Sequence, residues 1–105
     1  MEFPNLEYIN QLAGGDAAIK MKLIHIIKTE FPEEKKEYYR SIEVGVFPRI
    51  EENVHRVKHK ISILGLTKGY EVANAFEYNL RKLDLKGKED FEKILIVITQ
   101  YIKTI

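Results

Sequence analysis

The sequence predicts an all-α protein, specifically an antiparallel four-helix bundle with a short N-terminal helix. Two observations support this class. Apolar residues recur at spacings of three and four along most of the chain, which is the period of an amphipathic helix. No stretch alternates apolar and polar residues as a half-buried strand does. Short connections between long helices favour antiparallel neighbours, and 105 residues fit one domain, 1–105.

The N-terminal helix is predicted over residues 6–13. Asn5 is expected to cap it, because a side-chain oxygen satisfies backbone N–H groups that have no partner in the first turn. Gly14 and Gly15 are expected to end it, because glycine tolerates the left-handed conformation of a helix stop.

The second helix is predicted to begin after an Asp16 cap and to reach Gly45. Pro32 is expected to kink this helix or to restart it, since proline removes a backbone donor. The apolar face, predicted by spacing, consists of Ile19, Leu23, Ile26, Ile27 and Phe31.

Three further helices follow. One is expected to open at Pro48 and end at Gly65, with a core stripe of Ile50, Val54, Val57, Ile61 and Leu64. The next is expected to be capped at Thr67 or a neighbour, with Val72, Ala73, Phe76, Leu80 and Leu83 inward. The last begins near Glu89, and its stripe is Phe91, Leu95, Ile98 and Ile102.

Composition narrows the function classes. A net charge of +1 argues against a nucleic-acid partner, which requires a basic surplus to neutralise phosphates. The absence of cysteine excludes disulfides, iron–sulfur clusters and thiolate zinc sites. No phosphate-cradling glycine loop or dinucleotide fingerprint is present, so the chain is not expected to use ATP itself. Without a signal-peptide pattern or a long apolar run, a cytoplasmic protein with no membrane contact is expected.

One polar face of the helix after Pro48 is not needed for the core. It carries Glu51, His55, Lys58, His59 and Ser62, which lie three or four residues apart and therefore share a side of the helix. Two of the three histidines of the chain are on this face. The third, His25, is expected to be an ordinary surface residue.

The spacing on this face resembles the histidine-containing phosphotransfer (HPt) domain family. That family has the pattern His-x-x-Lys-Gly and a glycine ten positions after the histidine, and here His55 and Lys58 are followed by Gly65. Residues 12–16 are similar to the family's Gly-Gly-Asp opening of the second helix. Phe76 and Glu77 match the apolar residue and Glu or Gln of the next helix. The resemblance covers nearly the whole chain.

The resemblance implies a phosphoryl carrier of a multistep two-component phosphorelay, not an enzyme. His55 would accept the phosphoryl group at Nε2, Lys58 would stabilise the phosphate, and Glu77 would accept the Nδ1 proton and fix the tautomer. The implied partners are response-regulator receiver domains and a hybrid histidine kinase. No cofactor is expected here, because the receiver supplies magnesium, and HPt domains of this type are commonly monomeric.

His59 departs from the family, which has glycine at that position. Its side chain would either crowd the site or donate a hydrogen bond to the phosphate. The second hypothesis is therefore a phosphotransfer-inactive HPt-like docking domain that binds a receiver or a kinase. His55 and His59 also have the i, i+4 spacing of a metal-chelating pair. No third ligand is evident in the sequence, so no metal is expected and a metal-binding bundle remains a distant third reading.

Overall fold

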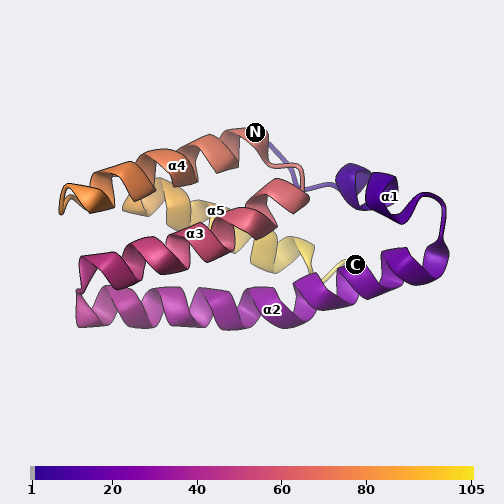
Figure 1. Ribbon diagram of the computed structural model, residues 1–105, viewed down its shortest axis with the longest axis horizontal. Helices are drawn as coiled ribbons and strands as arrows, with labels where there is room; N and C mark the ends of the chain where they lie inside the picture. Colours follow the sequence, from indigo (N-terminus) through magenta and orange to yellow (C-terminus); the bar gives the residue numbers. More distant parts are fainter. Residues whose placement is uncertain (1) are drawn as a thin grey trace.

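The computed structural model describes residues 2–105, which form five helices and no strand (Figure 1). The all-helical class is confirmed. The helices are α1 (Glu7–Ala13), α2 (Ala17–Val44), α3 (Phe47–Ile63), α4 (Thr67–Arg81) and α5 (Lys88–Tyr101). The chain reverses after α2, so that α3 returns along it; α4 packs on α3, and α5 lies behind them. The short α1 packs against the first part of α2.

The expected starts and stops of the first two helices are largely confirmed. Gly14 adopts the left-handed conformation at φ 58° and ends α1. The Asp16 carboxylate accepts hydrogen bonds from the backbone N–H groups of Ala18 (2.9 Å) and Ile19 (3.2 Å), and so caps α2. The expected cap of α1 is wrong by one residue: Leu6 occupies the cap position, and Asn5, just before it, accepts a hydrogen bond at Oδ1 from the Glu7 N–H at 3.1 Å.

Of the two alternatives expected at Pro32, a restart is excluded, because α2 is one continuous helix from Ala17 to Val44. Phe31 and Tyr38 are fully buried on either side of the proline, and their packing compensates for the lost backbone donor. The expected apolar face is wrong for Ile19 and Ile26, which are exposed. Ile27 and Phe31 are in the core, and Leu23 packs against it.

The stripes expected for α3 and α5 both lie in the core. Every residue of both stripes is buried: Ile50, Val54, Val57, Ile61, Leu64, Phe91, Leu95, Ile98 and Ile102. On α4 the expectation holds for Ala73, Phe76 and Leu80. Leu83 is the exception: it is 71% exposed and has a φ of 60°, because α4 has already ended at Arg81.

The start of α4 is capped from a distant part of the chain. Thr67 is the first helical residue and not the cap. The Glu2 carboxylate accepts hydrogen bonds from the backbone N–H groups of Lys68 (2.9 Å) and Gly69 (3.0 Å). A negative charge at a helix N-terminus is stabilising, so the N-terminal segment of residues 2–5 is held at the corner between α3 and α4.

Hydrogen bonds between α2 and α5 bring the last helix against the second. The Tyr38 hydroxyl donates to Glu92 Oε2 at 2.9 Å, and Lys35 Nζ donates to Thr99 Oγ1 at 2.9 Å. Burial, together with the Glu92 carboxylate, raises the pKa of Tyr38 well above its usual range, so its hydroxyl stays protonated. Among residues 2–105, no helix has both the length and the apolar character required to cross a bilayer.

Candidate functional site

The packing of α3 against α4 brings His55 and Glu77 into contact. His55 Nδ1 and Glu77 Oε1 are 3.0 Å apart. The two groups differ sharply in burial, since the His55 side chain is 57% exposed and the Glu77 side chain only 5%. A buried carboxylate beside Nδ1 favours the tautomer that carries its proton on that nitrogen. Nε2 then holds the lone pair, on an exposed ring.

Lys58 is buried beneath this pair instead of lying on a solvated face. Its ammonium donates to Glu77 Oε2 at 3.0 Å and to Asn74 Oδ1 at 2.9 Å. The ring of Tyr70 is also close, with its centroid 5.3 Å from Lys58 Nζ. Glu77 therefore bridges an exposed imidazole and a buried ammonium, with one oxygen for each. The Lys58 ammonium already donates to two side chains of α4. Its expected contact with a phosphate stays a prediction.

His59 lies one turn beyond His55 on the same side of α3. The centroids of the two rings are 5.1 Å apart, and their planes meet at 89°. His59 is exposed. Of the other residues of the expected polar face, Ser62 is exposed, while Glu51 accepts a hydrogen bond from Arg81 Nε at 2.7 Å. That hydrogen bond raises the pKa of Arg81. His25 is exposed on α2, as expected.

A hollow of about 320 Å³ opens beside His55. Its lining comes from the start of α3 and from Glu77 of α4, and consists of Pro48, Glu51, Glu52, His55, Arg56 and Glu77. The hollow gives a second molecule access to the edge of the imidazole. A neutral, oriented imidazole with a free lone pair is a nucleophile, and the carboxylate behind it stabilises the positive charge that develops on the ring during attack.

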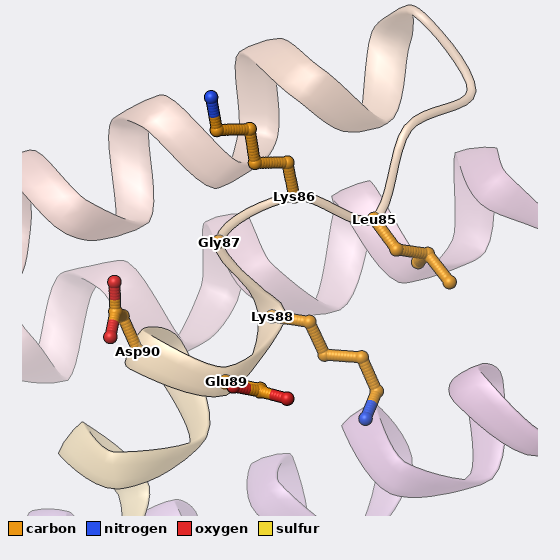
Figure 2. Close-up of a pocket in the computed structure, with 6 residues that line it drawn as sticks. All are labelled: Leu85, Lys86, Gly87, Lys88, Glu89 and Asp90. Atoms are coloured by element: carbon orange, nitrogen blue, oxygen red, sulfur yellow. The ribbon is translucent and has the colours of Figure 1, made fainter.

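Another hollow, of about 420 Å³, lies at the start of α5 and is lined by residues 85–90. Figure 2 shows its side chains pointing apart: those of Lys86 and Lys88 project in opposite directions, and Asp90 turns to a third side. They do not converge on one point, so this hollow lacks the arrangement of a site. Within the described part of the chain, no group of three or more His, Cys, Asp or Glu side chains is placed to hold a metal ion.

Asn74 and Tyr70 are the site residues that sequence reasoning did not identify. Asn74 lies three residues before Glu77, and this spacing places both side chains on one face of a helix. This spacing could therefore have predicted that Asn74 faces α3 together with Glu77. Tyr70 is one further turn back on α4, and no sequence feature distinguished it from the other tyrosines.

Comparison with known proteins gives no relative for this chain, which matches no family model, no curated protein and no solved structure. The geometry of the site therefore carries the functional argument.

Proposed function

We propose that the protein is a histidine phosphotransfer protein, which carries a phosphoryl group on His55 between receiver-domain aspartates. The observation that carries this proposal is the 3.0 Å contact between His55 Nδ1 and the buried Glu77 carboxylate on an imidazole that is itself exposed. The contact orients the ring, and the exposure lets a second protein reach Nε2. An ordinary surface histidine has only the exposure.

The chemistry requires no cofactor on this chain. The Nε2 lone pair attacks the phosphorus of an aspartyl phosphate, so that an N–P bond forms and the P–O bond breaks. The aspartate carboxylate leaves with the electron pair. The Nδ1 proton remains on the ring, where Glu77 offsets the positive charge. Transfer onward is the reverse reaction with another receiver, and that receiver supplies the magnesium and acidic pocket.

The fold and partners follow from the same proposal. The four longer helices form the antiparallel four-helix bundle of the HPt type, in which α3 and α4 present His55 to the receiver. The partners are response-regulator receivers and a hybrid histidine kinase, and the protein acts as a cytoplasmic monomer. Signalling encounters of this kind bury modest, mixed apolar and polar surfaces.

One observation favours a second candidate function. The His59 ring lies 5.1 Å from the His55 ring, at a position where the HPt family has glycine. If this side chain excludes the phosphoryl group, the protein is a docking domain that binds a receiver or a kinase without exchange.

Phosphorylation with phosphoramidate tests the proposal. The donor releases ammonia as the N–P bond to His55 forms, so the expected product is heavier by one phosphoryl group and loses it in acid. Intact-mass spectrometry follows the reaction. We expect the His55→Gln variant to take up no label.

The matched control is His25→Gln, because His25 is also an exposed helical histidine but has no carboxylate contact among the described residues. This variant is expected to label like the wild type. Equal labelling of the wild type and His55→Gln contradicts the proposal. Labelling of the His59→Gly variant without labelling of the wild type favours the docking domain.

A further inference from the structure

A phosphoryl group on His55 would need hydrogen-bond donors that the ion pair beneath it does not provide. This step rests on the proposed function. Phosphoryl groups on side chains carry about two negative charges near pH 7. Lys58 is the expected cation, but it is only 8% exposed and donates to Glu77 and Asn74. Its charge already offsets the carboxylate that orients His55.

Acidic side chains dominate the N-terminal side of His55. Glu51 and Glu52 line the hollow there, and Glu51 is paired with Arg81. Arg56 also lines the hollow, where it is the single lysine or arginine beside three glutamates, Glu51, Glu52 and Glu77. The C-terminal side of His55 is different, because its neighbour there is the exposed imidazole of His59.

We propose that His59 is the phosphate-binding residue of this site: its ring N–H donates to a phosphoryl oxygen on His55 Nε2. Side chains of an α-helix lean toward the N-terminus, so a residue at i+4 reaches back over residue i. The ring centroids of His55 and His59 are 5.1 Å apart, so the two side chains are in contact. A neutral imidazole offers one N–H donor and an imidazolium offers two, so the contact forms in either state.

The contact has a defined kinetic consequence. Loss of the phosphoryl group passes through a loose, metaphosphate-like transition state. The three oxygens of metaphosphate share one negative charge, whereas those of the bound phosphoryl group share about two. A donor to those oxygens therefore stabilises phosphohistidine more than the transition state and lengthens its lifetime. A merely steric side chain slows loading and leaves this lifetime unchanged.

Three variants separate the two roles. His59→Gln keeps a donor, His59→Leu keeps comparable bulk without a donor, and His59→Gly removes the side chain. Each protein is loaded with phosphoramidate and freed of donor, and the decay of the phosphorylated species is followed by intact-mass spectrometry. Circular dichroism confirms that each variant is folded; His59 is exposed, so the fold is expected to tolerate all three.

We expect phosphohistidine to decay about fivefold to tenfold faster in His59→Leu and His59→Gly than in the wild type, as for loss of one charge-assisted hydrogen bond at an exposed site. His59→Gln is expected to fall between them and the wild type. Equal lifetimes in all four proteins overturn the inference while the phosphotransfer function stands. Faster loading of His59→Gly with an unchanged lifetime also overturns it, in favour of a steric role. If neither the wild type nor any His59 variant is labelled, the proposed function fails and this inference fails with it.

Discussion

Lys58 and Lys60 are two residues apart on α3, yet their ammonium groups face opposite neighbours. Lys58 faces α4, where it donates to Glu77 and Asn74. Lys60 faces α2, where its Nζ lies 2.8 Å from Glu30 Oε1 and 3.2 Å from Glu34. Both lysines are buried, and each packs with a buried carboxylate, Glu77 or Glu34. The two interfaces of α3 therefore use the same ion-pair chemistry.

The difference between the two pairs lies in the second oxygen of each carboxylate. Glu77 uses its other oxygen to contact His55, whose ring reaches solvent. Glu34 has no such partner: both of its oxygens lie 3.2 Å from Lys60 Nζ, and the buried Oε1 makes no hydrogen bond in the described structure. A buried ion pair holds two helices together in both places. Of the two pairs, only Lys58–Glu77 also contacts an exposed imidazole, that of His55.

Alanine substitutions test the structural half of this comparison and give the largest expected effect. Glu77→Ala leaves Lys58 buried with an amide oxygen as its remaining acceptor, and an uncompensated buried charge costs about 3–5 kcal/mol of unfolding free energy. Glu34→Ala leaves Lys60 with Glu30 at 2.8 Å, so a smaller loss of about 1–2 kcal/mol is expected. Urea denaturation of both variants measures the two values. Equal losses would mean that Glu30 does not compensate for Glu34.

Glutamine substitutions test the functional half. Glu77→Gln keeps the shape of the side chain but removes the charge behind the imidazole, so phosphoramidate labelling of His55 is expected to slow by about tenfold or more, as when the orienting partner of a functional histidine is lost. Glu34→Gln serves as the matched control and is expected to label at the wild-type rate, because its carboxylate contacts no histidine. Labelling that slows equally in both variants would show that helix packing, and not the Glu77 charge, controls the reaction.

Local sequence signals predicted much of this fold. Apolar spacing located the buried faces of α3 and α5, and Asp16 and Gly14 marked helix ends that the structure confirms. These signals work because capping and amphipathic packing act within a few residues of the chain. Local signals could not predict that Glu2 caps α4, because Glu2 is 66 residues from Lys68, whose N–H donates to its carboxylate.

The site was predictable as a set of residues but not as a set of contacts. Helical spacing placed His55, Lys58 and His59 on one face, and the HPt resemblance added Glu77. Neither the spacing nor the resemblance predicted that Lys58 turns under the imidazole toward α4. A lysine at the edge of a helix stripe can snorkel to solvent or bury its ammonium. Which one occurs depends on the neighbouring helix, here on Asn74 and Glu77.

The contact between Lys60 and Glu30 of α2 predicts a dependence of stability on pH, which is the smallest effect expected. The hydrogen bond from Lys60, and then its charge, lower the pKa of Glu30 from its usual 4.5. A carboxyl whose pKa is depressed by folding stabilises the protein above the unfolded-state value, and this contribution is lost as the pH falls through the folded-state value. Glu30→Gln should therefore be less stable than the wild type near neutral pH, and the two should converge as the pH falls below the lowered pKa of Glu30.

The loss of unfolding free energy in Glu30→Gln is expected to be small, because Glu30 is the exposed one of the two glutamates that contact Lys60. The Glu30 side chain is 54% exposed, so water and salt screen its interaction with Lys60. Exposed pairs contribute about 0.2–1 kcal/mol, and 0.5 M salt is expected to reduce the difference further. Urea denaturation across this pH range measures it. A Glu30→Gln penalty that persists unchanged at low pH and in high salt would show that Glu30 acts through packing, and Lys60 would then depend on Glu34 alone for its charge partner.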